Sequence, residues 1–351
     1  MHKLILLIFV ILFLVACTAK KTKYIKDFVI ASGQMPNIAK DDKGIIHLVF
    51  GSGDSLLYSF SNSIGNSFST PSLIAVIPQL AASHTRGPQI TSSNGNLIII
   101  TCNDAGNIFS YHKQGTKSWE ISGKVNDTDT TAKENFIALS ANKQFAFAIW
   151  LDVRENGKNK IYGSKSIDGG KTWQKNIMIY TSPDSTVCEC CKPSILLVDN
   201  IITVMFRNWV NGNRDMYIIQ STNGGNTFKT AQKLGNNSWK INGCPMDGGA
   251  FAINKSGKIN TVWRREDKIF TALPGMPEKQ IGEGKACTIE TINDKNIYAW
   301  KEKNDIIILR PDGIKIVTGK GNTPILKALD DKNILCIWES DHQIRGSVIA
   351  M

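Results

Sequence analysis

The chain has 351 residues, 42% of them hydrophobic, and a formal charge of +11 at pH 7. This length allows two domains or one large all-β unit. Its 29 glycines and 11 prolines suit short strands joined by tight turns, and no long stretch keeps the 3.6-residue period of an amphipathic helix. The lysines are scattered and no zinc-finger, basic-helix or RNP-type pattern accompanies them, so we expect a basic soluble surface and no nucleic-acid partner.

The first residues predict export. Lys3 precedes an apolar run from Leu4 to Ala16, which is too short to span a bilayer and has the length of a signal-peptide core. The run ends in Leu14-Val15-Ala16-Cys17, which resembles the lipobox of bacterial lipoproteins. The resemblance implies a signal peptide at residues 1–16, acylation of Cys17 by chains such as palmitate, and a tether at 17–23.

The acyl chains would hold the protein at the membrane of the bacterial cell envelope. Thr18, in the place where Asp would follow the cysteine, indicates sorting to the outer membrane by analogy. The alternative is an ordinary secretory signal in which Cys17 stays unmodified.

From residue 24 onward the chain repeats a unit of an apolar strand, a polar turn and a second strand that ends in an aromatic residue. These ends are Phe50, Trp150, Phe206, Trp263, Trp300 and Trp338, with Thr101 in the second place. The turn residues Gly44, Gly95, Asn200 and Gly257 lie six positions before their strand ends, so the units share a register. Seven units are counted, with six as the alternative, and each has room for about four strands, which is typical of β-propeller blades.

The last unit, from Pro324 to Met351, has only three expected strands. The apolar and extended segment from Tyr24 to Ala31 is expected to supply the fourth and to close the ring. Residues 24–351 are therefore predicted to form a single all-β propeller domain that is monomeric.

A short turn motif occurs in three units. Ser166 to Trp173 is nearly complete, Ser221 to Phe228 is close to it, and Ser61 to Phe68 is a degenerate third copy. In such a turn Asp or Asn accepts hydrogen bonds from nearby backbone N–H groups, Gly takes the positive φ angle, and the aromatic residue packs beneath the hairpin.

The motif resembles the Asp-box (BNR repeat) of the sialidase superfamily, and the whole chain resembles a bacterial sialidase-like lipoprotein. The resemblance implies a propeller fold and an exo-α-sialidase type of glycoside hydrolysis. It also implies that the boxes are structural and lie between the third and fourth strands, on the face opposite the active site. The box residues are Ser166, Asp168, Gly170, Trp173, Asn223, Gly225 and Phe228.

If each unit is a four-stranded meander, the loops that enter the blades and the loops after the second strands share one rim. Sialidases bind a substrate carboxylate with three arginines, because guanidinium groups match a carboxylate in a bidentate way. Arg86, Arg207 and either Arg264 or Arg265 are the candidates in this chain. The chain departs from the family at the first blade, where Gln34 lies in the place of the first arginine.

The resemblance also implies a Tyr nucleophile and an Asp acid/base. Tyr298 is the candidate nucleophile, and Asp247 and Asp152 are candidate acids. The structural alternatives are a packed aromatic for Tyr298, a turn cap for Asp247 and an ion pair with Arg154 for Asp152.

Five cysteines are expected in blade-entering loops: Cys188, Cys190, Cys191, Cys244 and Cys287. In an exported protein, clustered cysteines favour a disulfide, for example between one of the first three and Cys244. The same set suits a soft metal such as Cu(I) or Zn, and no other cofactor is expected. Redox chemistry is a further alternative.

Three hypotheses therefore follow. In the first, the protein is a lipid-anchored sialidase-like hydrolase. In the second, it is a non-catalytic propeller whose rim binds a glycan or another anionic partner. In the third, it is a protein with a thiol-based metal site.

Overall fold

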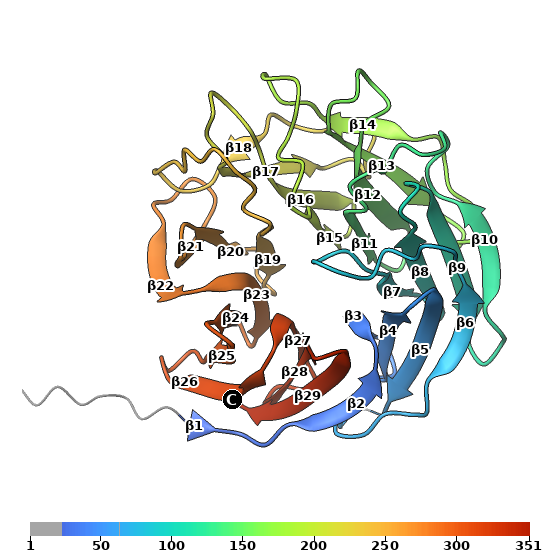
Figure 1. Cartoon of the computed structure of the whole chain (residues 1–351), viewed down its shortest axis with the longest axis vertical. Helices are drawn as coiled ribbons and strands as arrows, with labels where there is room; N and C mark the ends of the chain where they lie inside the picture. The colour runs from blue at the N-terminus through green and yellow to red at the C-terminus, as the bar shows by residue number, and fades with distance from the viewer. Residues whose placement is uncertain (1–22, 63) are drawn as a thin grey trace, which may run out of the picture.

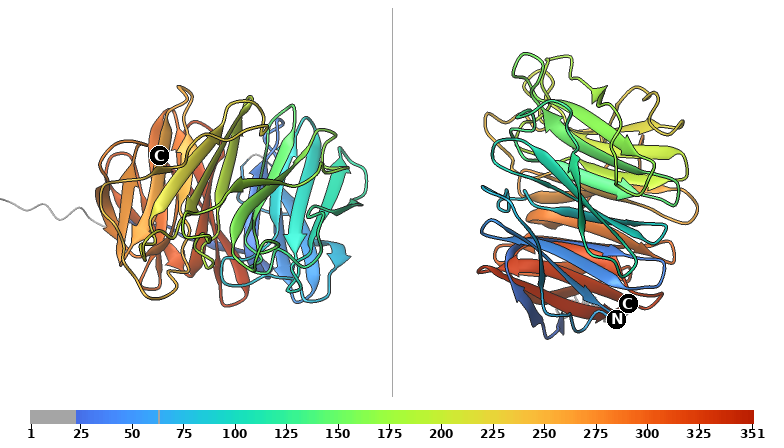
Figure 2. Two further views of the ribbon diagram at one scale, coloured as in Figure 1. Left: turned by 90° about the horizontal axis from the view of Figure 1, so that it is seen from above. Right: turned by 90° about the vertical axis from the view of Figure 1, so that its right-hand side faces the viewer.

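The computed structural model describes residues 23–62 and 64–351, and these form a seven-bladed β-propeller (Figure 1). The predicted signal peptide at 1–16, Cys17 and the predicted tether up to residue 22 lie outside the described residues. Each blade is a four-stranded antiparallel meander, so the prediction of seven blades is confirmed and the alternative of six is wrong. Figure 2 shows the blades side by side around the ring. In the described part of the chain, no helix is long and apolar enough to cross a membrane.

Each blade begins with its innermost strand, and the later strands follow outwards from the centre of the ring. Blade 1 has β3 (Gln34–Lys40), β4 (Ile46–Ser52), β5 (Ser55–Ser61) and β6 (Ser72–Val76). Blade 2 has β7 (Gln89–Ser93), β8 (Asn96–Cys102), β9 (Ile108–Gln114) and β10 (Glu120–Lys124). Blade 3 has β11 (Ile137–Ala141), β12 (Ala146–Asp152), β13 (Lys160–Ser166) and β14 (Ile177–Tyr180). Blade 4 has β15 (Ser194–Val198), β16 (Ile201–Arg207), β17 (Met216–Ser221) and β18 (Gln232–Lys233).

Blade 5 has β19 (Ala250–Ile253), β20 (Ile259–Arg265), β21 (Lys268–Ala272) and β22 (Lys279–Glu283). Blade 6 has β23 (Lys285–Ile292), β24 (Lys295–Glu302), β25 (Asp305–Leu309) and β26 (Lys315–Lys320). Blade 7 has β27 (Asn322–Ala328), β28 (Asn333–Ser340), β29 (Gln343–Ala350) and, from the other end of the chain, β2 (Phe28–Ser32).

The N-terminal strand closes the ring, as the sequence predicted. β2 pairs antiparallel with β29, with Ser32 opposite Gln343, and the ion pair of Asp27 with Arg345 at 2.6 Å adjoins this seam. The predicted closing segment began at Tyr24, but Tyr24 lies in β1 (Lys23–Tyr24), which pairs in parallel with β26 on the outside of blade 6. Lys23, expected in the tether, is the other residue of this strand.

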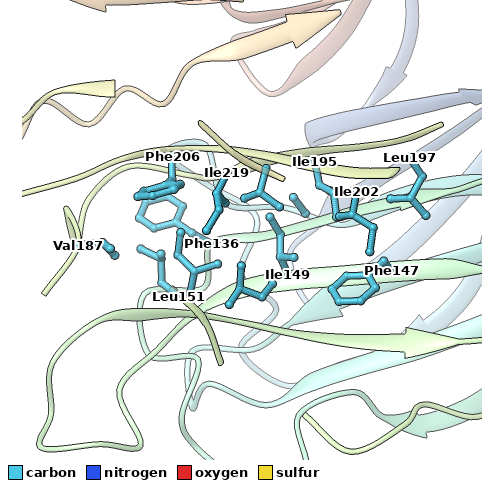
Figure 3. Close-up of a cluster of buried hydrophobic side chains, with 14 of the residues drawn as sticks. Phe136, Phe147, Ile149, Leu151, Val187, Ile195, Leu197, Ile202, Phe206 and Ile219 are labelled. Atoms are coloured by element: carbon cyan, nitrogen blue, oxygen red, sulfur yellow. The ribbon is translucent and has the colours of Figure 1, made fainter. Parts of the chain in front are cut away.

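The core lies between the blades. Every residue of β12 is buried, because neighbouring blades cover both faces of the sheet. Phe147, Ile149 and Leu151 pack against blade 4 (Figure 3), and the alternate side chains pack against blade 2. The aromatic residues predicted to end the second strands are buried within this inter-blade core, including Trp150, Trp300 and Trp338. The outermost strands are more exposed, as in β10. Packing between adjacent blades therefore fixes the ring on which the loops are displayed.

The Asp-boxes lie between the third and fourth strands, as predicted. Ser166 Oγ accepts the Gly170 N–H at 2.9 Å and donates to Asp168 Oδ1 at 2.8 Å, while Asp168 also accepts the Thr172 N–H at 3.0 Å. Gly170 has a φ of 86°, and a Cβ there would come within 2.6 Å of Ile98 in blade 2. The second box repeats this pattern.

In the second box, Ser221 Oγ accepts the Gly225 N–H at 2.9 Å and Asn223 Oδ1 accepts the Thr227 N–H at 3.0 Å. The aromatic residues of both boxes pack against inter-blade cores: Trp173 between blades 2 and 3, and Phe228 between blades 3 and 4. Each of these two boxes therefore joins its own blade to the preceding blade, which is a structural role.

Candidate functional site

One face of the ring collects the loops that enter the blades and the loops that follow the second strands. We call it the mouth face. Because each blade is a meander, the Asp-box turns lie on the opposite face. Residues as distant in sequence as Gln34, Asp247 and Glu339 meet on the mouth face, where they line one cavity. This confirms the topological part of the predicted rim.

The cavity has a volume of about 400 Å³, within the range of small-ligand sites. We call it the mouth cavity. It is lined by Gln34, Met35, Ser83, His84, Thr85, Met246, Asp247, Lys285, Ala286, Lys301, Asn322, Thr323 and Glu339. A second cavity of about 200 Å³, the central channel, shares Met35, Thr85, Asp247, Ala286 and Thr323 with it.

Left-handed backbone recurs in the loops that line the mouth cavity. Met35, Thr85, Met246, Ala286 and Thr323 all have φ angles between 48° and 70°. Each lies at the entrance of a different blade, in the entering loop or at the second residue of the innermost strand, and none is a glycine, Asn or Asp that tolerates this conformation well. Strain of this kind concentrates at ligand sites, where the surrounding structure holds it in place.

Asp247 is the one predicted catalytic residue that lines the mouth cavity. Its side chain is 4% exposed, and its Oδ2 accepts the Ala286 N–H at 2.9 Å and lies 3.9 Å from Arg264 Nη1. Burial raises the pKa of Asp247, against the opposing effects of the Ala286 N–H and of the charges of Arg207, Arg264 and Lys285. Asp247 thus accepts a backbone N–H, as its structural alternative predicted, and its carboxyl group is also suited to proton transfer.

Lys285 and Lys301 were not predicted as site residues, although both line the mouth cavity. Lys301 Nζ donates to Asn322 Oδ1 at 2.5 Å, and burial together with the charge of Lys285 lowers its pKa. Within the described residues, neither ammonium group has a carboxylate oxygen within 4.0 Å. The carboxylate of Glu339 is instead engaged by the Met35 N–H at 3.0 Å.

A register signal could have found these residues. In several blades a polar or charged residue directly follows the strand-ending aromatic at the mouth-face end of the second strand, as Arg207 does after Phe206 and Arg264 after Trp263. By the same register, Lys301 follows Trp300 and Glu339 follows Trp338.

A lysine also lies in the central channel. Lys192 Nζ donates to Gln89 Oε1 at 2.8 Å, which links the loop entering blade 4 to β7 in blade 2. Burial lowers the pKa of Lys192 to about 8. The channel walls approach closely here, since a Cβ on Gly248 would lie 2.2 Å from the Lys192 carbonyl oxygen.

The four candidate arginines do not converge on the mouth cavity. Arg207 is 1% exposed and donates to the carbonyl oxygens of Asp247, Arg214 and Arg264 at 2.8 to 3.2 Å. Its guanidinium group therefore fastens three loops of the mouth face to one another.

The other three arginines are also engaged within the protein. Arg264 donates to the carbonyl oxygens of Glu266 and Pro245, and Arg265 pairs with Glu278 at 2.8 Å. Arg86 donates to the Glu134 carbonyl at 2.9 Å and stacks on Phe136. None of the four lines the mouth cavity.

Two predicted catalytic residues lie away from the mouth cavity. Asp152 is buried and accepts hydrogen bonds from Trp150 Nε1 at 2.7 Å and from Arg154, as in its structural alternative. The Tyr298 hydroxyl lies 3.1 Å from Thr271 Oγ1, between blades 5 and 6, so this residue is a packed aromatic.

Three cysteines form a buried group beneath the mouth face. We call Cys188, Cys190 and Cys191 the thiol cluster; their exposed fractions are 0, 4 and 2%. The Sγ of Cys188 lies 3.7 Å from that of Cys190 and 3.4 Å from that of Cys191. Hydrogen bonds with these two thiols lower the pKa of Cys188 against the effect of burial, aided by the charges of Arg207 and Arg214.

The disulfide predicted between this cluster and Cys244 is not present in the structure. Cys244 is exposed, and all seven cysteines of the described residues are free thiols. Cys287 is buried and lines the central channel. The pairing of the cysteines in the exported protein stays a prediction.

Comparison with models of protein families finds no match, and comparison with curated proteins finds none either. Solved structures do match. The BP39L lectin from Burkholderia pseudomallei is 10% identical with a TM-score of 0.64, and the match covers 92% of this chain and 97% of the lectin. The polysaccharide lyase Uly1 is 10% identical with a TM-score of 0.57, covering 96% of this chain and 94% of the lyase.

The NanB sialidase from Streptococcus pneumoniae is 10% identical with a TM-score of 0.47, covering 92% of this chain and 70% of the sialidase. The lectin and the lyase define the fold class of this chain, a complete propeller of their kind, and leave its family open.

Proposed function

We propose that this protein is a β-propeller of the cell envelope that binds an anionic glycan in the mouth cavity. The observation that carries the proposal is the pair of lysines, Lys285 and Lys301. Both ammonium groups face the cavity without a carboxylate partner within 4.0 Å, whereas the carboxylates of Asp247 and Glu339 already accept backbone N–H groups. Lys285 is exposed and Lys301 is half-buried, and the charge of Lys285 acts on Lys301. An anion placed between the two ammonium groups would be stabilised by both.

The rest of the lining suits a saccharide. Gln34, Ser83, Thr85 and Asn322 offer amide and hydroxyl groups for sugar hydroxyls, and Met35, Met246 and Ala286 offer apolar surface for a ring face. A volume of about 400 Å³ accommodates a ligand of one or two sugar residues. The resemblance of the fold to a lectin and a polysaccharide lyase supports the same class of ligand.

Hydrolysis is the second candidate, and Asp247 favours it. A buried carboxyl group with a raised pKa at the wall of the cavity is a suitable general acid. The engagement of the four arginines with other parts of the protein, and the burial of Tyr298 between blades, favour binding over a sialidase type of catalysis.

The test is a binding assay with oligosaccharides that carry sialic or uronic acids, each compared with its neutral counterpart. The wild type should bind acidic members selectively. Lys285→Ala and Lys301→Ala should each weaken binding about 10- to 100-fold, the loss expected for one charge-assisted hydrogen bond. Lys171→Ala, in an Asp-box on the opposite face, is the matched control and should bind normally. Equal binding of neutral and acidic glycans, or unchanged binding by both cavity variants, would refute the proposal.

The same assay separates binding from hydrolysis. Release of free sugar by the wild type, lost in Asp247→Asn, would establish the hydrolase. Binding without sugar release would establish the lectin-like function.

The envelope location rests on the lipobox-like sequence that ends at Cys17. We propose that the acylated chain is held at the outer membrane. Cys17→Ser should move the protein from the membrane fraction to the soluble fraction of the envelope, and a variant that stays membrane-bound would contradict anchoring through this residue.

A further inference from the structure

The thiol cluster has the geometry of a metal site. The ligand atoms of Cys188, Cys190 and Cys191 all lie within 4.8 Å of one another, and two of the separations are 3.4 and 3.7 Å. A disulfide would require about 2.05 Å. Three sulfurs that surround one ion at about 2.3 Å are about 4 Å apart, so this spacing admits an ion at the centre with small side-chain shifts.

The three sulfur ligands favour particular metal ions. Thiolates favour soft ions such as Cu(I) and Zn(II). Structural zinc takes four ligands, whereas no fourth His, Cys, Asp or Glu joins the group in the part of the chain that the structure describes. The neighbouring Glu189 does not supply one, because both of its oxygens bind Arg214 at 3.0 and 3.1 Å. Three sulfurs without a fourth donor suit monovalent copper, which accepts trigonal coordination.

The surroundings offset part of the charge of such a site. Three thiolates and one Cu(I) carry a net charge of −2, which a buried site must compensate. Arg214 Nη1 lies 3.0 Å from Cys188 Sγ, and the charge of Arg207 also acts on this thiol. Within the described residues the buried Arg207 has no carboxylate within 4.0 Å, and its guanidinium group is met by backbone carbonyls and the ring of Trp239.

We propose that Cys188, Cys190 and Cys191 bind one Cu(I) ion as three thiolates, with Arg214 and Arg207 offsetting part of the charge. The Cu(I) ion displaces the protons that the three thiols still hold, and these protons leave to solvent. Binding involves no electron transfer. The site is separate from the mouth cavity and does not depend on the proposed glycan function, since none of the three cysteines lines that cavity.

The experiment titrates the full-length reduced protein with Cu(I) under anaerobic conditions, against a chromogenic Cu(I) chelator. One ion per chain should bind, and X-ray absorption should give three sulfur neighbours at about 2.3 Å. Cys188→Ser and Cys190→Ser should each weaken binding at least about 100-fold, because they remove a direct ligand. Cys336→Ser, a buried thiol in β28, is the matched control and should leave binding unchanged.

A second measurement covers variants that fail to fold. One equivalent of Cu(I) should protect three thiols of the wild type from alkylation, and mass spectrometry of peptides should assign them to the thiol cluster. Binding of zinc in preference to Cu(I), protection of other cysteines, or protein from the native compartment with a disulfide within the cluster and no copper would overturn the proposal.

Discussion

The carboxylate of Glu339, at the end of β28, accepts the backbone N–H of Met35 at 3.0 Å. Blade 7 is thereby joined to blade 1 on the mouth face, while β2 joins the two chain ends at the outer edge of blade 7. The same contact holds Met35 at its φ of 49°, so closure of the ring and shape of the mouth cavity are linked.

Glu339→Ala should therefore lower the free energy of unfolding by about 1–2 kcal/mol, the cost of leaving a partly buried N–H without its charged acceptor. Chemical denaturation measures this change. Glu339→Gln keeps a side-chain acceptor, so its free energy of unfolding should fall by less. Glu283→Ala, at an exposed position of β22, should leave the free energy of unfolding unchanged. Equal stability of Glu339→Ala and the wild type would contradict this link between blades.

Arg207 is predicted to be structural. Arg207→Ala leaves three buried carbonyl groups without their donor, so the free energy of unfolding should fall by at least about 3 kcal/mol. Arg310→Ala, which breaks a more exposed ion pair with Asp312, should cost at most about 1 kcal/mol. A stable Arg207→Ala variant that fails to bind acidic glycans would instead place this guanidinium group at the ligand.

Asp168 should stabilise the protein in a pH-dependent way. Partial burial raises the pKa of Asp168, but hydrogen bonds from Thr172, Ser166 and Lys171 outweigh it and lower the pKa below the ordinary value of 3.8. The folded protein thus holds this proton less tightly than the unfolded chain does. The contribution is complete above pH 3.8 and is lost as the pH falls through the lowered pKa.

Asp168→Ala should consequently lower the melting temperature near neutral pH and approach the wild type in acid. Asp42→Ala, at an exposed turn, serves as the control. A deficit that stays constant with pH would contradict the role of the ionised carboxylate.

Asp247 should make binding of an anionic glycan depend on pH. Burial raises its pKa, against the charges of Arg207, Arg264 and Lys285, so the neutral form persists above pH 3.8. As the pH rises through the raised pKa, a negative charge appears beside the ligand and affinity should fall. Calorimetric titrations across this range should show a flat profile for Asp247→Asn, and an identical slope in both proteins would exclude this residue as the cause.

The sequence predicted the features that depend on local pattern. The Asp-box turns are encoded within eight residues, and the spacing from turn to strand-ending aromatic fixed the register of blades as distant as those of Phe50 and Trp338. The missing fourth strand of the last blade led directly to the closing segment, which overlaps all but the last residue of β2. The turns and the strand register repeat along the chain, and the closing strand was found as the gap in that repeat.

The candidate site was predicted less well, because side-chain direction is not repeated. Register placed Arg207 and Arg264 at the mouth face correctly, but it could not tell that Arg207 turns inward to three carbonyl groups. Lys301 occupies the corresponding position of its blade and lines the cavity instead. Whether such a side chain turns inward or lines the cavity depends on which loop carbonyl groups lie near it. The positions of these carbonyl groups are set only when the ring is assembled.

A crystal structure of the protein with its best-binding acidic oligosaccharide would show where the ligand binds. We expect the carboxylate of the sugar in the mouth cavity, within about 3 Å of the Nζ atoms of Lys285 and Lys301, as in charge-assisted hydrogen bonds. An oligosaccharide bound on the Asp-box face, or between blades at the outer edge of the ring, would contradict the proposed binding site.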